Sequence, residues 1–389
     1  MYDFIFENAQ QILNKIESMN IYSKKSVFHM GDYRFKLLGE GTFGMVFKVI
    51  YKNNTFIAKI MKKEDEEPRK ILKMVKKIKS IKDVKIQKLI EKYLTIVLEV
   101  QSESTPQVII FEYLDGSDLS DYLKSKDEIS ESEYYFIITK IIMAVTLLHN
   151  KLRISHRDLK PQNIFYNSKT GRLKLIDFGF SCFLNDTSCF NRYQGTGNFI
   201  HPRMNNKKLK NLRGGGMSIR GLKTKKIGNN SVNKINRIKS NKNNALLRSF
   251  PKPRSQDVFS LVIIVFYIYR YIDMELNEED LKMEEFIKRF FSPNRYTQNK
   301  KEKLTTRLSK KRILFQNLLS IDETKTTNPL ISTLIGFIKK YWNLGENNFI
   351  VGRRDYSKQV LDSLLEISIS KLSRKNRKLF SKEKKNIGD

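Results

Sequence analysis

Residues 156–163 read His156-Arg157-Asp158-Leu159-Lys160-Pro161-Gln162-Asn163, and the β-like residues 173–176 then lead into Asp177-Phe178-Gly179. This spacing allows a loop between two strands to bring three polar groups to one point. Asp158 can accept the proton of a substrate hydroxyl. The oxygens of Asn163 and Asp177 are hard ligands of the kind that Mg²⁺ prefers beside the phosphates of ATP. The stretch therefore predicts a site for phosphoryl transfer.

These motifs resemble those of the eukaryotic-type protein kinase family, and specifically its serine/threonine branch. The resemblance implies an enzyme that uses ATP and Mg²⁺, with Mn²⁺ as an alternative ion, to phosphorylate Ser or Thr hydroxyls of proteins. It also implies that Asp158, Lys160 and Asn163 are catalytic, and that Asn163 and Asp177 bind the metal. Lys160 and Thr196 match the serine/threonine pattern, in which both side chains touch Asp158 and position an aliphatic hydroxyl.

A glycine-rich segment precedes these motifs, in the order that the family requires. Glycines let the backbone bend closely over phosphate, so that N–H groups do the binding. Alone, such a stretch is better explained by a glycine-rich hairpin turn, but here it stands ahead of Ile57-Ala58-Lys59-Ile60. The resemblance assigns Lys59 to the α and β phosphates. It assigns the phosphate-covering loop to Leu38, Gly39, Glu40, Gly41, Thr42, Phe43, Gly44, Met45 and Val46.

An apolar run, residues 108–114, leads into the acidic segment 115–119 and resembles the hinge that holds adenine. By resemblance, Phe111 closes the back of the ATP pocket and the backbones of Glu112 and Leu114 face the base. Asp118 falls where the family often places an acid near the ribose. An ordinary strand followed by a turn is compatible with the same residues.

The acidic partner of Lys59 is predicted from the face of a helix. Three glutamates precede Pro68, namely Glu64, Glu66 and Glu67. Glu67 is the choice because Ile71, Met74 and Ile78 continue its face along the lysine-rich helix expected over residues 69–80. The gap from Lys59 is short, so the alternative that the ion pair is absent or built differently stays open.

The end of the activation segment departs from the family pattern. Residues 195–203 resemble G-T-x-x-[FY]-x-x-P-E, but His201 and Arg203 replace the usual Ala and Glu. By resemblance, the missing Glu would have paired with Arg354. Either Asp355 or another acid compensates, or the segment is held more loosely.

The positive charge is concentrated in a few segments of a chain whose net charge is +32. Fifteen Lys or Arg and no Asp or Glu occur from Asn205 to Arg254, which predicts a disordered insertion, because such a segment buries too little apolar surface to offset its ordering entropy. Residues 300–312 and 371–385 are also basic. The charge suits contact with a polyanion, either nucleic acid or an acidic surface, while the base composition of an A+T-rich genome explains it equally well.

The order of motifs predicts an α+β, bilobal, protein-kinase-like fold. Residues 1–30 are expected to be an N-terminal helical extension, and residues 31–368 the kinase domain. The domain divides into a small β-rich lobe with the hinge (31–114) and a larger, mainly helical lobe (115–368) with the basic insertion at about 205–250. Residues 369–389 are expected to be a basic tail.

The longest apolar run, residues 261–269, is about half of the ~20 residues that span a bilayer, so a buried helix is expected and no transmembrane segment. By resemblance, Asp257 before it braces the catalytic loop. His149 is interpreted as a packing residue, and Cys182 and Cys189 as free thiols. An intracellular protein, cytoplasmic or nuclear, is expected, with a viral or virion-associated protein as the alternative.

Three other functions remain open. A catalytically weak scaffold with a kinase fold is disfavoured by the presence of Lys59, Asp158, Asn163 and Asp177, but Glu67 and Arg203 keep it in view. A small-molecule or lipid kinase is the least favoured, given residues 196–202, which in protein kinases form a peptide platform. A polyanion- or nucleic-acid-binding protein on a kinase fold is suggested by the basic insertion, although no recognised nucleic-acid-reading motif supports it.

Overall fold

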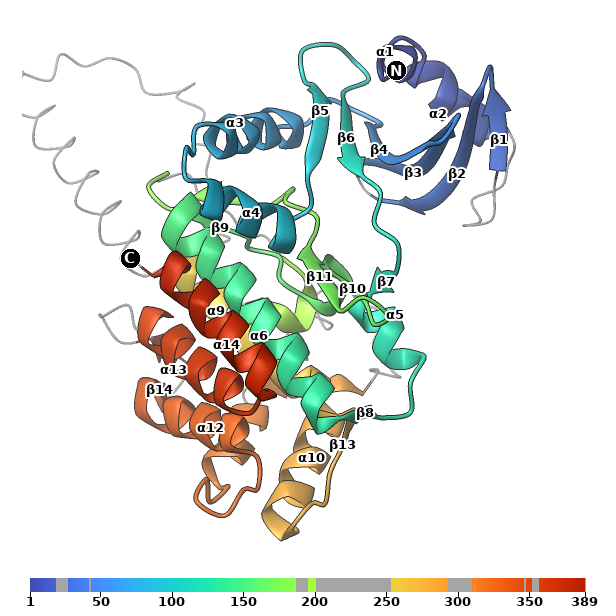
Figure 1. Cartoon of the computed structure of the whole chain (residues 1–389). Coiled ribbons are helices and arrows are strands. Elements are labelled where there is room, and N and C mark those ends of the chain that lie inside the picture. Colours follow the sequence, from blue (N-terminus) through green and yellow to red (C-terminus); the bar gives the residue numbers. More distant parts are fainter. Residues whose placement is uncertain are drawn as a thin grey trace, which may run out of the picture.

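The computed structural model describes residues 1–18, 27–41, 43–186, 195–200, 253–292, 310–311, 313–345, 348–351 and 357–388, and only the backbone of residues 341–351. These residues form a small strand-rich lobe above a larger helical lobe (Figure 1), so the expected α+β bilobal fold is confirmed. Several predicted features lie outside the described residues: Thr42, the basic insertion, His201, Arg203, Arg354 and Asp355.

The small lobe is built on a six-stranded antiparallel sheet with the order β1-β2-β3-β4-β6-β5. Apolar and polar residues alternate along its strands, as in β2, where Tyr33, Phe35 and Leu37 are buried. The strands are β1 (Val27–Met30), β2 (Tyr33–Glu40), β3 (Gly44–Tyr51), β4 (Asn54–Met61), β5 (Val97–Gln101) and β6 (Val108–Glu112).

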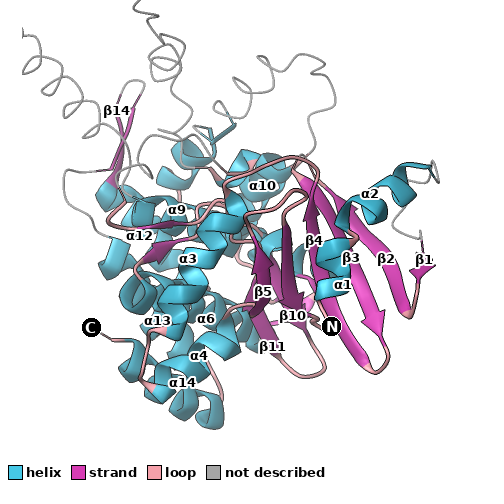
Figure 2. Cartoon of the chain, turned by 90° about the horizontal axis from the view of Figure 1, so that it is seen from above, coloured by secondary structure: helices cyan, strands magenta, loops and turns pink. Residues whose placement is uncertain are grey.

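Two N-terminal helices, α1 (Asp3–Glu7) and α2 (Ala9–Ser18), lie over the sheet (Figure 2). Ile5, Ile12 and Ile16 are fully buried in the same apolar cluster as the sheet residues. The ring of Phe4 stacks on that of Tyr33, with centroids 4.5 Å apart. The N-terminal extension expected over residues 1–30 is helical in α1 and α2, but these helices belong to the small lobe, because their apolar residues are buried in the same cluster as the sheet.

Helices α3 (Glu67–Lys79) and α4 (Val84–Tyr93) separate β4 from β5 in the chain. α3 packs beside β5, and α4 lies between α3 and the large lobe (Figure 1). Asp83 caps α4 by accepting a hydrogen bond from the Lys85 amide at 2.8 Å. Tyr93 and Leu94, at the end of α4, are fully buried in the core of the large lobe.

Two almost completely buried helices, α6 (Glu131–Leu147) and α9 (Pro253–Tyr269), form the centre of the large lobe. α6 continues through one π-helical turn, Leu148–Leu152. By length and composition the combined segment could cross a membrane, but 83% of its most apolar window is buried inside the fold, as expected of a core helix. The surrounding helices are α5 (Leu119–Lys124), α10 (Glu278–Phe291), α12 (Pro329–Tyr341) and α13 (Ser357–Ser370).

Short strands frame the loops of the large lobe. The pair β10 (Ile164–Asn167) and β11 (Arg172–Leu175) lies between the two sequence motifs of the predicted site and is extended by β7 (Ser117–Asp118). The others are β8 (Ile129–Ser130), β9 (Ile154–Ser155), β12 (Cys182–Phe183), β13 (Ile272–Asp273), β14 (Trp342–Gly345) and β15 (Asn348–Val351).

Three sequence-based expectations differ from the structure. The predicted basic tail forms helix α14 (Arg374–Ile387), which packs through Phe380 and Ile387 because these residues share one helical face. Lys311, placed by sequence in an exposed basic stretch, is completely buried. Cys182, predicted to be a free thiol, is disulfide-bonded, and Cys189 lies outside the described residues.

Candidate active site

A cleft of about 570 Å³ lies between the lobes and brings several of the predicted site residues together, although Asp158 and Lys160 are not part of its lining. Its volume is in the range of small-molecule sites. Leu38, Val46 and Ile57 line its small-lobe side, while Phe111 and Leu114 line its back and edge. The polar residues predicted at this site also line it, namely Lys59, Glu112, Asp118, Asn163 and Asp177.

The glycine-rich loop is a tight turn between β2 and β3. The amide of Gly41 donates to the carbonyl of Gly44 at 2.9 Å. A Cβ atom on Gly44 would lie 2.4 Å from the carbonyl oxygen of Ile60, so only glycine allows β3 and β4 to approach this closely. Glu40 forms an ion pair with Lys62, which directly follows β4. This pair connects the turn to the residues after Lys59.

Lys59 and Glu67 form the ion pair that sequence reasoning favoured, with 2.6 Å between Nζ and Oε1. Lys59 Nζ is also 3.8 Å from Asp177 Oδ1. Burial by itself lowers the pKa of Lys59, but the charges of Asp177 and Glu67 outweigh it and raise the pKa. The ammonium group is therefore held between two carboxylates, facing the cleft.

Glu67 is positioned by two residues that the motifs did not reveal. Asp65 Oδ1 accepts a hydrogen bond from the Glu67 amide at 2.8 Å, and the Asp65 amide donates to Gln107 Oε1 at 2.8 Å. Gln107 is almost fully buried and donates to the carbonyl of Ser102. Glu67 is the first residue of α3, so no preceding helical turn fixes its backbone. The hydrogen bonds of Asp65 and Gln107 fix it instead.

Three side chains hold the carboxylate of Asp158. Lys160 Nζ and Asn163 Nδ2 donate to Oδ2 at 2.8 and 3.0 Å, and Thr196 Oγ1 donates to Oδ1 at 2.8 Å. Lys160 Nζ also donates to Thr196 Oγ1 at 2.7 Å. The contacts implied by the serine/threonine resemblance are thus present, and they bring the catalytic loop and the activation segment together.

Asp177 and Asn163 supply the predicted metal-binding oxygens. Asn163 Nδ2 donates to both the carbonyl and the carboxylate of Asp158, which turns its amide oxygen away from Asp158. Asp177 adopts a left-handed φ of 60°. Burial raises the pKa of Asp177, but Lys59 and His156 outweigh this effect, and the pKa is lowered. Among the described residues, no other group of His, Cys, Asp and Glu side chains could hold a metal ion.

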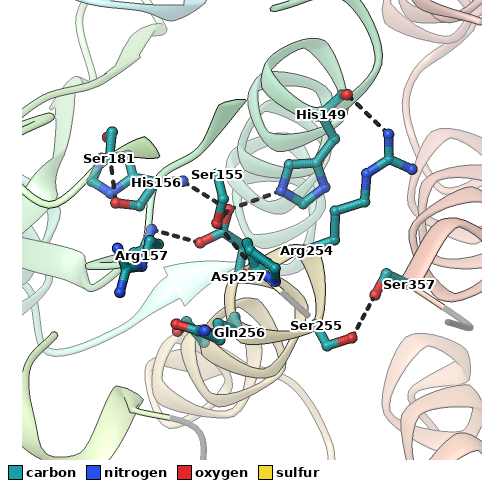
Figure 3. Close-up of polar contacts among 12 residues, drawn as sticks. His149, Ser155, His156, Arg157, Ser181, Arg254, Ser255, Gln256, Asp257 and Ser357 are labelled. Atoms are coloured by element: carbon teal, nitrogen blue, oxygen red, sulfur yellow. Dashed lines mark hydrogen bonds and ion pairs between the residues drawn. The ribbon is translucent and has the colours of Figure 1, made fainter. Parts of the chain in front are cut away.

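Asp257 on α9 braces the catalytic loop from behind (Figure 3). Its fully buried carboxylate accepts from the backbone amides of His156 and Arg157 at 2.8 and 2.7 Å and from Ser155 Oγ at 2.9 Å. His149 Nε2 lies 2.8 Å from Oδ2. His149 is thus buried as expected, but it contributes a polar contact as well as packing.

The end of the activation segment is fixed against the catalytic loop at Gly195. Its φ is 117°, and a Cβ atom there would lie 2.9 Å from the carbonyl oxygen of Arg157. Glycine is therefore required for the close approach that brings Thr196 to Asp158.

The hinge residues adopt positions compatible with their predicted roles, and each also has a structural contact. Asp118 caps α5 by accepting from the Asp121 amide at 2.9 Å, and burial raises its pKa. Glu112 accepts from the Ile96 amide at 2.7 Å and pairs with Lys174 on β11. The Glu112–Lys174 pair links the hinge to the strand that delivers Asp177.

Comparisons with known proteins agree with this geometry. A family model described as a protein kinase domain matches residues 33–211, which include the glycine-rich loop, Lys59, Asp158 and Asp177. The chain is 34% identical over 163 residues to serine/threonine-protein kinase unc-51 of Caenorhabditis elegans, covering 39% of this chain and 18% of that protein.

Two further relatives are similar over parts of the same region. The chain is 31% identical over 174 residues to death-associated protein kinase 2 of Mus musculus, covering 43% of this chain and 46% of that protein. It is 38% identical over 95 residues to mitogen-activated protein kinase kinase 2 of Arabidopsis thaliana, covering 24% of this chain and 26% of that protein. The chain thus spans less than half the length of each of these curated relatives.

Proposed function

We propose that this chain, which belongs to the eukaryotic-type protein kinase family, transfers the γ-phosphate of ATP to Ser or Thr hydroxyls of protein substrates. The observation that carries the proposal is the set of contacts joining Asp158, Lys160 and Thr196 at 2.7–2.8 Å. Asn163, which donates to Asp158, lines the cleft together with Asp177, and phosphoryl transfer there requires an acceptor for the hydroxyl proton.

The cleft fits a nucleotide with its metal ion. Ile57, Val46 and Leu114 offer apolar surface to a base, and Lys59 offers positive charge to phosphates. Asp177 and Asn163 would hold Mg²⁺. In nucleotide sites this ion usually takes only one or two ligands from the protein, and the others are phosphate oxygens and water. When bound, the ion neutralises charge on the phosphates.

The remaining roles in the reaction belong to the chain's own side chains. Asp158 accepts the proton of the substrate hydroxyl, and Asn163 and Thr196 keep its carboxylate in one orientation. Lys160 places a positive charge beside Asp158, where negative charge gathers during transfer. The Lys59–Glu67 pair holds the phosphate-binding ammonium in the cleft.

The test is transfer of label from [γ-³²P]ATP to myelin basic protein, casein and histone, followed by identification of the labelled amino acid. Asp158→Asn should lower the rate by a factor of about 10² to 10⁴ through loss of the general base, while nucleotide binding largely survives. Label on Ser or Thr is expected. Equal rates for wild type and Asp158→Asn would overturn the assignment and favour a scaffold without catalysis.

We also propose contact with a polyanion, either nucleic acid or an acidic surface, through the basic insertion and the C-terminal segment. In support, α14 is anchored by apolar residues and exposes Arg374, Lys375, Arg377, Lys378, Lys382 and Lys385. Such contact would be strongly salt-dependent.

A further inference from the structure

Lys311 is a charged side chain with no exposed surface. It lies in a helical segment, residues 310–311 and 313–319. Burying an ammonium group is costly unless its hydrogen-bonding capacity is met, and an apolar residue would fill the same space at lower cost. A completely buried lysine therefore indicates specific acceptors that require a positive charge.

Those acceptors are backbone carbonyls of the activation segment. Lys311 Nζ donates to the carbonyl of Ile200 at 2.5 Å and to that of Gly197 at 3.0 Å. The ammonium also lies 5.7 Å from the centre of the Phe259 ring. The two carbonyls are on either side of the short 3-10 helix Gly197–Phe199, which directly follows Thr196.

Other backbone groups of the segment 196–200 are also hydrogen-bonded. Ser260 on α9 donates to the carbonyl of Phe199 at 2.8 Å, and the Phe199 amide donates to the carbonyl of Thr196 at 2.9 Å. Among the contacts described for this segment, Lys311 Nζ supplies a positive charge and holds two carbonyls at once. Thr196, at the start of the segment, carries the hydroxyl bonded to Asp158.

We propose that Lys311 is a positioning residue for the protein-substrate side of the active site. This inference rests on the proposed kinase function. By holding Gly197 and Ile200, the ammonium keeps Thr196 in contact with Asp158 and Lys160 and keeps the following backbone in the shape that receives a peptide. Lys311 does not line the interlobe cleft, so its loss affects peptide binding and transfer and leaves nucleotide binding intact.

The first measurement separates the two substrates. Lys311→Met removes the donors at similar side-chain length, and it should lower kcat/KM for a peptide by about 10- to 100-fold, as expected from leaving buried carbonyls without a donor. The KM for ATP should stay within about twofold. Lys310→Met is the matched control: Lys310 Nζ donates to the carbonyl of Ser292 at 2.7 Å and not to the activation segment, so this variant should keep wild-type peptide kinetics.

A second measurement does not depend on activity. Hydrogen exchange of peptides covering residues 195–200 should become faster in Lys311→Met than in Lys310→Met, while peptides from α6 keep their protection. If Lys311→Met does not fold, Lys311→Gln serves for both measurements, because it keeps a donor for one carbonyl. Unaltered peptide kinetics and unaltered exchange in a folded variant would overturn the role of Lys311.

The two proposals fail in different ways. Absence of peptide phosphorylation by the wild-type chain would defeat the kinase proposal, and the exchange measurement would still decide whether Lys311 holds the segment. An active wild type with Lys311→Met equally active would defeat only the positioning role. An equal loss of peptide and nucleotide binding would also defeat it, because that result indicates a general loss of structure.

Discussion

At the scale of single residues, Glu67 shows how a short connection still delivers the Lys59 partner. It stands at the beginning of α3, where the free N–H groups of a helix favour negative charge. Burial raises the pKa of Glu67, and the ion pair with Lys59 offsets that effect only in part, so the pKa stays above its usual value. The Asp65 carboxylate fixes the backbone that presents Glu67 to Lys59.

Replacing Glu67 by Gln should lower kcat/KM by about 10- to 100-fold, nearly as far as Lys59→Met, because the largely buried Lys59 would keep only the more distant Asp177 carboxylate, 3.8 Å away. The adjacent Glu66→Gln is the matched control: Glu66 pairs with Lys70 on the exposed side of the helix, where an ion pair contributes little. Peptide phosphorylation by both variants decides the matter. Full activity of Glu67→Gln would contradict the assigned pair.

At the scale of elements, α14 connects parts of the molecule that lie far apart in the sequence. Glu383 on α14 accepts from Lys92 and Tyr93 of α4, both at 2.5 Å. Phe380 packs edge-on against Phe136 of α6, with centroids 5.9 Å apart. Since α4 directly follows α3, the last helix of the chain supports the segment that carries Glu67.

Removing the Glu383 carboxylate should destabilise the fold measurably. Glu383→Ala is expected to lower the free energy of unfolding by about 2–3 kcal/mol, because the hydrogen-bonded carboxylate and its partner Tyr93 are buried, while Lys92 is partly exposed. Glu366→Ala, which breaks the solvent-exposed pair with Lys384, should change it by about 0.5 kcal/mol or less. Urea denaturation compares the two; similar values would mean that α14 contributes little to stability.

The elements also show what the sequence could and could not predict. Asp158, Lys160, Asn163 and Asp177 were predictable because their geometry depends on short spacings around β10 and β11. Lys311 and Glu383 were not, since their partners lie more than a hundred residues away along the chain. In a chain with 73 Lys and Arg, the sequence around a buried lysine looks no different from the sequence around an exposed one. Gln107 is likewise recognisable only from its contacts with Asp65 and Ser102.

At the scale of the whole molecule, the concentration of charge is separate from the described catalytic core. Residues 205–250 contain no acidic residue and lie outside the described residues, whereas the described contacts of the cleft residues, Asp257 and Lys311 are made by other segments. Unopposed cations cannot be packed into a core without costly desolvation. The insertion and the catalytic site are therefore expected to be separable.

Replacing residues 205–250 by a short Gly/Ser linker should leave phosphorylation of a small peptide within a few-fold of wild type. Binding to RNA, DNA or acidic vesicles should weaken, with a shallower dependence on salt as phosphate contacts are lost. Lys382→Glu with Lys385→Glu on the exposed face of α14 tests the other basic segment. Loss of peptide phosphorylation by a folded linker variant would refute separability.

The helices over the small-lobe sheet have a practical consequence for preparing this protein. The match to the protein kinase family model covers residues 33–211. The buried residues Ile5, Ile12 and Ile16 lie before that range. Helix α9, which holds the catalytic loop through Asp257, lies after it. A recombinant fragment trimmed to the matching residues would present the uncovered aromatic face of β2 and β3 to solvent. Such a surface invites aggregation, so the stretch that is recognisable by similarity is shorter than the stretch that must be expressed together.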